Sequence, residues 1–363
     1  MQLKPTLQKR YSKETQSALE AQRLAHEISF GPIVFQVSRL MRKFGILQML
    51  IDSEKGLTLD EIVEKTKLSK YACQCLLESS LTIGTVLFQD GKFICSKAGW
   101  FLLNDQLVDT NMNFNHNVNY LGWFHLEEAL LDGKPEGLIK VFGNWNSIFE
   151  GFLQLPQNVQ DSWLNFNHFY SGDTFDQALQ VVFADKPKNL LDIGGNIGNW
   201  ALHCVNYDPD VLVTIIDLPQ QIEEMNRHIA GKKGSNRILG YGCDLLDEKT
   251  VIPTGFEVIW MSQLLDNFSE KESVEVLSKI AKSMSYDTKL YVMEIFWDRQ
   301  PFDTGAYILT QISSYFTALA TGKGKNYSSE DMIRFIETAG LAVEDIKDGI
   351  GRGHSIIQCK KPE

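Results

Sequence analysis

The chain carries near its centre the sequence Asn189-Leu-Leu-Asp-Ile-Gly-Gly-Asn-Ile-Gly-Asn-Trp200. Its apolar first half is typical of a buried strand, and its glycines mark a turn into a helix. Glycine lets the backbone turn sharply and approach a ligand because no Cβ stands in the way, and the first turn of the helix offers free N–H groups to an anion. We therefore expect a strand, a ligand-binding turn and a helix, in that order.

Strands and helices alternate from this turn to the end of the chain. The expected strands are 189–193, 211–216, 256–261 and 289–293, the expected helices are 200–207, 219–230, 270–284 and 328–339, and a closing pair of strands lies near 343–347 and 354–359. This alternation predicts a Rossmann-like α/β domain with a mostly parallel, doubly wound sheet. Ligands of such sheets bind beyond the carboxyl ends of the strands, so the loops that follow the strands are where we expect the chemistry.

The spacing of the glycines distinguishes two cofactor classes. Gly198 follows Gly194 by four residues and Gly195 by three. This differs from the G-x-G-x-x-G of dinucleotide sites, and an acid, Asp192, stands two residues before the first glycine. The combination favours S-adenosylmethionine over NAD.

Two further acids follow later strands. Asp217 ends the second strand, where a carboxylate can accept hydrogen bonds from both hydroxyls of a ribose. Asp244 follows in Gly242-Cys-Asp-Leu245, at the place where an adenine amino group usually meets an acceptor. Any one of these acids could be a helix cap or a turn residue. Three of them in chain order after a glycine-rich turn favour a shared ligand.

Composition limits the classes of protein. The chain has 363 residues, enough for two domains, and its 44% hydrophobic and 22% charged residues exclude a disordered or collagen-like protein. The net charge of -11 argues against general nucleic-acid binding and against docking on anionic lipid. The six cysteines include no C-x-x-C pair, and the sequence has no signal peptide and no long apolar run. We expect a cytoplasmic protein without metal.

The N-terminal residues 1–105 have the pattern of a winged helix. Two helices are expected between residues 15 and 50, and a capping box at Thr58 starts the next pair. A hairpin with an Asp90-Gly91 turn follows. Since no Lys or Arg occurs from Tyr71 to Gly91, where DNA phosphates would be met, packing or dimerisation is favoured over DNA binding.

Residues 106–180 are rich in aromatic and amide side chains. We expect helices that link the two domains, and most of these aromatics should be core. A minority could line a pocket for an aromatic or polyene-sized ligand in front of the catalytic domain, residues 181–363. The candidates for this pocket are Trp123, Phe166, His168 and, from the start of the last strand, His354. His116 and His125 are further candidates from the same region. For each of these histidines a structural role is the better interpretation.

On these residues the chain resembles the two-domain small-molecule O-methyltransferases, of the plant caffeate and flavonoid type and the bacterial aromatic polyketide type. The resemblance covers nearly the whole chain and rests on the turn at 190–195, on Ile216-Asp-Leu-Pro219 and on the segment 264–270. It implies a homodimer formed through the N-terminal domain and a class I S-adenosylmethionine site. The implied cofactor contacts are Asp192, Gly194, Gly195, Asp217, Leu218, Asp244, Leu245 and Ser262.

The resemblance also implies where catalysis occurs. Relatives have a His base in a Leu-His-Asp-Trp segment, and this chain has Leu265-Asp-Asn-Phe268, so Asp266 replaces the base. A carboxylate partly buried among aromatics has a raised pKa and could accept a phenolic proton. Asn267 matches bacterial members that lack the His and rely on orientation, and Glu294 matches an acid that orients the base. The third family acid is not recognisable in residues 321–327.

The leading hypothesis is an S-adenosylmethionine-dependent O-methyltransferase that acts on a hydroxyl of an aromatic or conjugated small molecule, in secondary metabolism. One alternative is a C-methyltransferase or a non-methylating enzyme of the same fold, because the His and the third acid are missing. Another is a winged-helix regulator that senses a ligand.

Overall fold

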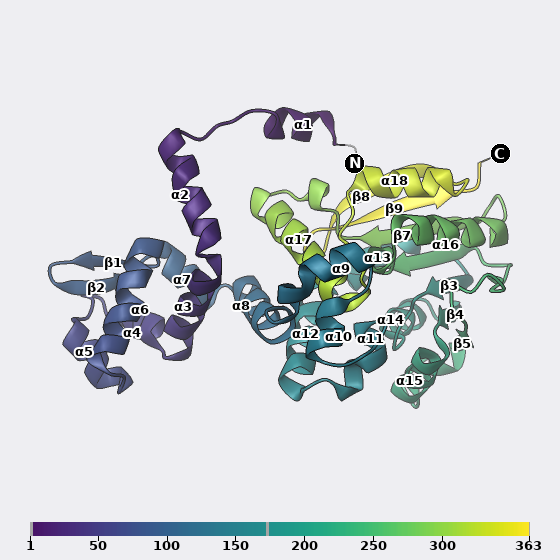
Figure 1. Cartoon of the computed structure of the whole chain (residues 1–363). Helices are drawn as coiled ribbons and strands as arrows, with labels where there is room; N and C mark the ends of the chain where they lie inside the picture. The colour runs from purple at the N-terminus through teal and green to yellow at the C-terminus, as the bar shows by residue number, and fades with distance from the viewer. Residues whose placement is uncertain (1–2, 172–173, 363) are drawn as a thin grey trace. The chain divides into compact units, whose positions relative to one another are not determined.

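The computed structural model describes residues 3–171 and 174–362 and divides into two compact units. The smaller unit is Arg10–Val118, and the larger is Asn119–Glu363 together with Met1–Lys9 (Figure 1). The predicted class, a helical winged-helix domain followed by an α/β domain, is confirmed. The finer division at residues 105 and 180 stays a prediction.

The smaller unit has the expected helix, turn, helix, hairpin order. Its elements are α2 (Ala18–Ser29), α3 (Gly31–Lys43), α4 (Ile46–Asp52), α5 (Leu59–Thr66), α6 (Lys70–Ile83), β1 (Val86–Gln89), β2 (Lys92–Cys95), α7 (Lys97–Asn104) and α8 (Gln106–Phe114), with α1 (Pro5–Tyr11) ahead of them. Thr58 and Glu61 form the predicted capping box. Asp90 and Gly91 both have positive φ, of 50° and 77°, as a tight hairpin turn requires.

Helix α2 buries none of its residues. It starts at a complete capping box on Ser17, so local interactions stabilise it. Leu19 and Ile28 are 78% and 70% exposed, and Phe30 and Ile33 beyond the helix are exposed as well. Apolar side chains gathered on one exposed segment are typical of a surface that another protein covers.

Helices precede the sheet of the larger unit. After η1 (Asn115–Asn119), where the chain passes from one unit to the other, they are η2 (Gly122–His125), α9 (Leu126–Asp132), α10 (Glu136–Val141), α11 (Ile148–Gly151), η3 (Phe152–Gln154), α12 (Gln157–Ser171) and α13 (Phe175–Val182). No helix in the described part of the chain is long and apolar enough to cross a membrane.

The sheet of the larger unit has the order β5-β4-β3-β6-β7-β9-β8. Its strands are β3 (Asn189–Ile193), β4 (Leu212–Asp217), β5 (Ile238–Gly242), β6 (Val258–Ser262), β7 (Lys289–Glu294), β8 (Ala342–Ile350) and β9 (His354–Lys360). All neighbours are parallel except β9, which runs antiparallel to β7 and β8. The order reverses at β3, where such sheets bind ligands.

Helices cover both faces of this sheet. Helices α16 (Glu270–Ser283) and α18 (Ser329–Thr338) share one core with Leu191, Ile193 and Met261. Helices α13, α14 (Asn199–Tyr207) and α15 (Pro219–Ile229) share the other with Leu190 and Trp260. Because successive residues of a strand point to opposite faces, β3 contributes to both cores and is fixed from both sides.

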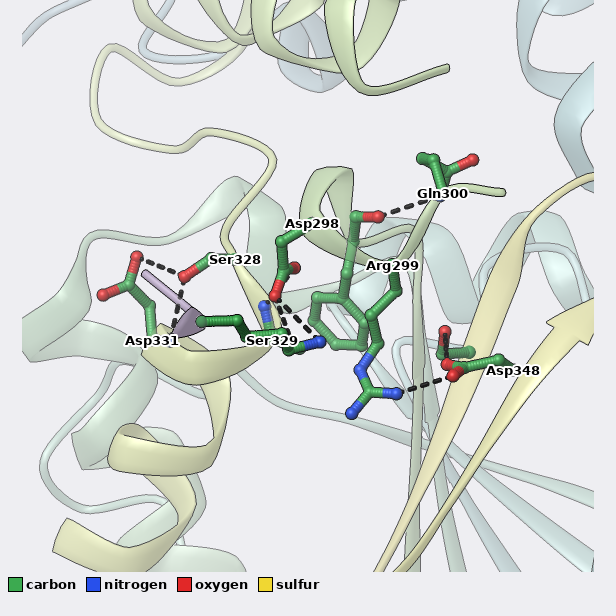
Figure 2. Close-up of polar contacts among 10 residues, drawn as sticks. Asp298, Arg299, Gln300, Ser328, Ser329, Asp331 and Asp348 are labelled. Carbon is green, nitrogen blue, oxygen red and sulfur yellow. Dashed lines mark hydrogen bonds and ion pairs between the residues drawn. The ribbon is translucent and has the colours of Figure 1, made fainter. Parts of the chain in front are cut away.

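A polar network holds the segment that follows β7 (Figure 2). Asp298 accepts hydrogen bonds from the backbone N–H and the hydroxyl of Ser329, at 2.7 and 2.6 Å, at the start of α18. Arg299 pairs with Asp348 of β8 at 2.6 Å. The amide of Gln300 donates to the carbonyl of Gly353, which precedes β9, at 2.9 Å. The carboxyl end of β7 is thereby tied to α18, β8 and β9.

Candidate active site at the carboxyl edge of the sheet

The glycine-rich turn after β3 has the close contacts that glycine allows. Gly194 and Gly198 have φ values of +73° and +81°, in the left-handed region. A Cβ on Gly195 would lie 2.6 Å from Oδ2 of Asp192 and 2.7 Å from the side chain of Ile215. The backbone at this turn therefore leaves no room for a larger residue.

Asp192 lies beneath the turn, with 2% of its surface exposed. Its Oδ2 is buried and has no hydrogen-bond partner among the described residues. Burial, and then the nearby charge of Asp217, hold the pKa of Asp192 well above its usual range. Burial therefore favours the neutral form of this acid, and its Oδ2 leaves a vacant hydrogen-bonding position beside the turn.

Asp217 joins the turn to the end of β4. Its Oδ1 accepts the N–H of Leu218 at 2.7 Å, and its Oδ2 accepts the N–H of Asn196 at 2.8 Å. Burial raises the pKa of Asp217, while these two hydrogen bonds lower it. Each carboxylate oxygen keeps a second lone pair, as the binding of two ribose hydroxyls requires.

The other predicted cofactor contacts lie along the same edge. Asp244 is exposed beyond β5, and its Oδ1 accepts the N–H of Leu246 at 2.8 Å. Leu245 is buried, and its carbonyl accepts a hydrogen bond from Lys279 at 2.7 Å. Ser262 ends β6 and is half-buried. Because β5, β4 and β3 are neighbours in the sheet, the acids that follow or end them stand in that spatial order.

Asp266, Asn267 and Glu294 come together at the ends of β6 and β7. The backbone N–H groups of Leu264 and Leu265 both donate to Oε1 of Glu294, each at 3.0 Å. Asn267 donates to Oδ1 of Asp266 at 2.7 Å, while its own Oδ1 is buried without a partner among the described residues. The two backbone bonds therefore hold Glu294 beside the turn that carries Asp266.

Both carboxyl groups are shifted toward their neutral forms. Burial raises the pKa of Asp266 to about 7. Glu294 is 3% exposed, and burial followed by the charge of Asp266 holds its pKa well above the usual range. Two neighbouring carboxyls in a dry site do not both ionise readily, so the charge of Asp266 opposes the ionisation of Glu294.

The loop of residues 321–327 packs tightly on the Asp266 turn. Thr321 donates to the carbonyl of Asn267, and Tyr327 to that of Phe268, each at 2.8 Å. A Cβ on Gly324 would lie 1.9 Å from the carbonyl oxygen of Asp266. The family's third acid was expected in this loop, but residues 321–327 include no acid. They hold the backbone of the Asp266 turn instead.

A group of aromatic side chains extends toward Asp266 through Tyr315. Trp163 of α12 donates to the hydroxyl of Tyr315 at 2.7 Å, and its ring lies 4.8 Å from that of Phe152 and 6.0 Å from that of Phe149. Tyr315 ends α17 (Asp303–Tyr315), and burial, together with the charge of Asp266, raises its pKa. A π-helical segment, η7 (Phe316–Ala320), follows, a feature frequent at functional sites.

The four predicted pocket residues are placed differently. Trp123 lies in η2, half-buried, and its Nε1 has no partner among the described residues. Phe166 of α12 packs 5.0 Å from the ring of Tyr170, and His168 is exposed. His354 is fully buried, which lowers its pKa to about 4, and its Nε2 lies 2.9 Å from Nε2 of Gln263.

Sequence reasoning passed over Tyr315, Trp163 and Gln263. Tyr315 belongs to a helix that the sequence did not predict, and Trp163 is one of many aromatics in residues 106–180. No group of three or more His, Cys, Asp or Glu side chains in the described ranges could hold a metal ion.

Comparisons with known proteins agree with this geometry. A model of the Dimerisation2-like domain matches residues 22–93, and a model of the O-methyltransferase domain matches residues 123–342. The mitomycin biosynthesis 6-O-methyltransferase of Streptomyces lavendulae is 24% identical over 91% of this chain and 92% of its own. The norreticuline-7-O-methyltransferase of Papaver somniferum is 25% identical over 73% of this chain and 71% of its own.

Solved structures share the fold over nearly the whole chain. The S-adenosylmethionine-dependent methyltransferase SibL in its apo form has a TM-score of 0.68 at 19% identity, and covers 93% of this chain and 98% of its own. Human N-acetylserotonin methyltransferase in complex with S-adenosylmethionine has a TM-score of 0.60 at 16% identity, over 97% of this chain and 100% of its own. The predicted fold and enzyme class are confirmed. The chain belongs to the O-methyltransferase family, with a dimerisation-type domain ahead of its methyltransferase domain.

Proposed function

We propose that this protein is a homodimeric enzyme that transfers the methyl group of S-adenosylmethionine to a hydroxyl of an aromatic small molecule in secondary metabolism. The observation that carries the proposal is the Asp266–Glu294 carboxyl pair, which lies at the ligand-binding edge of a methyltransferase fold and next to an aromatic group. Relatives named for mitomycin biosynthesis and for 3-hydroxy-5-methyl-1-naphthoate support an aromatic acceptor.

The residues of the glycine-rich turn fit S-adenosylmethionine. The cradle at Gly195 admits a close ligand, Asp217 offers two oxygens to ribose hydroxyls, and Asp244 stands beyond β5 for the adenine. Leu218, Leu245 and Ser262 complete the edge, and the vacant Oδ2 of Asp192 lies beside the turn. When bound there, the cofactor supplies a methyl group attached to a positively charged sulfur.

Asp266 is the base in this proposal. A phenolic hydroxyl has a pKa near 10, so an ordinary aspartate accepts its proton poorly. With a pKa of about 7, Asp266 is ionised in about half the molecules at neutral pH and is a much stronger base. It would accept the proton of the substrate hydroxyl, which makes the acceptor oxygen a better nucleophile toward the methyl group that the bound cofactor would supply. Asn267 donates to Oδ1 of Asp266 and orients this carboxyl, while burial and the charge of Asp266 favour the neutral form of Glu294.

Phe149, Phe152, Trp163 and Tyr315 hold the acceptor ring in the proposed enzyme. Aromatic rings in tilted or edge contact present the surface that a flat substrate needs. Methyl transfer requires the acceptor oxygen in line with the reacting bond, so orientation by this group contributes to the rate in addition to the base.

A second copy of the chain covers the exposed face of α2 in this proposal. The family model over residues 22–93 is named for dimerisation, and Ile28, Phe30 and Ile33 lie exposed within that range. Size-exclusion chromatography with light scattering tests this, since a dimer is expected for the wild type and a monomer for Ile28→Glu.

A second candidate is methyl transfer to carbon. One relative, 21% identical over 80% of this chain, is the bacteriochlorophyllide d C-20 methyltransferase of Chlorobaculum tepidum. In that reaction a carbon takes the place of the hydroxyl oxygen, and the proton leaves after attack.

The test is a product analysis. The enzyme is incubated with methyl-labelled S-adenosylmethionine and a panel of hydroxylated benzoates, naphthoates and phenazines, and the products are identified by mass and by the carbon shift of the new methyl. A methoxy signal from the wild type that is lost in Asp266→Asn supports the proposal. A carbon-bound methyl would support the second candidate, and no transfer to any aromatic acceptor would contradict the aromatic substrate class.

A further inference from the structure

The turn that carries Leu264 and Leu265 starts with a residue in an unusual conformation. Gln263 directly follows β6 and has a φ of 50°, in the left-handed region that glycine and asparagine occupy more readily. Its backbone N–H donates to the carbonyl of Met293 at 2.9 Å, which continues the pairing of β6 with β7. The next two N–H groups then turn away from the sheet and donate to Glu294. The left-handed residue is therefore the point at which this change of direction occurs.

A buried histidine lies against this residue. His354 is 0% exposed, and its Nε2 is 2.9 Å from the side-chain amide of Gln263. It begins β9, and the next residue, Ser355, pairs with Glu294 of β7. Its other ring nitrogen, Nδ1, is buried and has no partner within the described residues. Burying an imidazole with an unpaired nitrogen costs stability, so an apolar residue would stabilise this position better if packing were its only role.

The contact needs both side chains. Glycine or asparagine would adopt this φ with less strain, but neither side chain is long enough to replace the glutamine amide. Since burial keeps His354 neutral, the hydrogen bond adds no charge beside the carboxyl pair. The carboxyl pair consists of Asp266 and Glu294, and the tyrosines that feel the charge of Asp266 are Tyr315 and Tyr327.

We propose that Gln263 and His354 are positioning residues, whose buried hydrogen bond fixes the left-handed turn and so aims the N–H groups of Leu264 and Leu265 at Oε1 of Glu294. The catalytic consequence rests on the proposed role of Asp266 as the base. When the pair is broken, the turn relaxes and both N–H bonds to Glu294 weaken. The turn that carries Asp266 is then held less firmly and is more open to water, so burial raises the pKa of Asp266 less and Asp266 becomes a weaker base.

The first test uses hydrogen exchange of the full-length protein without substrate. Gln263→Gly removes both the side chain and the strain, so its melting temperature should equal or exceed that of the wild type. The amides of Leu264 and Leu265 should nevertheless exchange about tenfold faster. His354→Leu should act in the same way, whereas His354→Gln, which can still bond to Gln263, should keep most of the protection.

The second test follows the Asp266 carboxyl by carbon NMR during a pH titration, with its signal assigned through Asp266→Asn. In Gln263→Gly and His354→Leu the midpoint should fall by about one pH unit, and in His354→Gln it should stay within a few tenths. Unchanged exchange and an unchanged midpoint in both disrupting variants would overturn the proposal. So would faster exchange that occurs only with a lower melting temperature, because a purely structural role explains that result.

The role of Asp266 as the base and the positioning role of Gln263 and His354 can be disproved separately. If Asp266→Asn retains full methyl transfer, the assignment of the base is wrong, but exchange at Leu264 and Leu265 still decides whether Gln263 and His354 fix the turn.

Discussion

The two halves of the carboxyl edge are built in different ways. In the cofactor half, at the ends of β3, β4 and β5, short segments hold their own acids: Asp217 is bonded by its neighbour Leu218 and by Asn196 in the glycine-rich turn. In the acceptor half, at the ends of β6 and β7, the local bond from Asn267 to Asp266 is joined by bonds with distant segments, namely β7, β9 and the loop 321–327. The cofactor half is therefore built mainly from short sequence motifs, whereas the acceptor half depends on contacts between segments that lie far apart in the chain.

The largest effect should come from the acceptor half. Asp266→Asn removes the proposed base, so kcat should fall about a thousandfold, within the range for general bases, while affinity for S-adenosylmethionine is unchanged. Steady-state kinetics with the best acceptor of the panel and calorimetry of the cofactor measure the two quantities. Glu294→Gln, which can still accept both N–H bonds through its carbonyl oxygen, should lose much less. Equal losses of cofactor affinity and kcat in Asp266→Asn would mean that the two halves are not separate.

The next effect tests the cofactor half. Gly195→Ala places a Cβ 2.6 Å from Oδ2 of Asp192, so the turn must move, and affinity for S-adenosylmethionine should drop about a hundredfold. Isothermal calorimetry measures it, with Gly31→Ala as control because a Cβ there meets nothing within 4 Å. Wild-type affinity in Gly195→Ala would show that the turn is not the cofactor cradle.

A smaller effect is expected in the loop 321–327. Gly324→Ala pushes against the carbonyl of Asp266, so the base is displaced and kcat should fall about tenfold with cofactor affinity unchanged. Lys325→Ala, at an exposed neighbour, is the control. If kcat stays within twofold of wild type in Gly324→Ala, the loop does not fix the position of Asp266.

The smallest effect is on stability. The pKa of Asp266 is raised in the folded protein to about 7, so the fold favours the protonated acid. This contribution is fully present below the unfolded pKa near 4 and is lost as the pH rises through 7. The melting temperature of the wild type should therefore decline by a few degrees more than that of Asp266→Asn between pH 5 and pH 8. Scanning calorimetry measures both, and parallel declines would contradict the raised pKa.

Sequence reasoning succeeded where the signal is local. The strand at 189–193 has the predicted bounds, and the capping box at Thr58 forms. It missed β5, whose Gly240 and Gly242 argue against a strand. The structure explains Gly240, because a Cβ there would lie 2.6 Å from Ile222 of α15. It also missed α17, which starts without a side-chain cap at Phe302.

In the acceptor half the sequence indicated residue types but not their arrangement. Asp266 and Glu294 were identified through resemblance, yet their mutual influence depends on two strands that pair side by side. His354 was a pocket candidate for which a structural role was the better interpretation, and it is buried against Gln263, more than 90 residues away in the chain. No local pattern encodes such a contact, because it exists only after β9 joins the sheet.

The support of Glu294 has a consequence for how this enzyme could change its substrate. The segment after β7 is clamped by Asp298, Arg299 and Gln300, and the carboxyl of Glu294 is held by backbone amides. Three of the four aromatic residues proposed to hold the acceptor ring, Phe149, Phe152 and Trp163, belong instead to α11, η3 and α12. The carboxyl pair and these three aromatic residues lie in separate stretches of the chain. A mutant library confined to Phe149, Phe152 and Trp163 can therefore be screened for new acceptors while Asp266 and Glu294 stay unchanged.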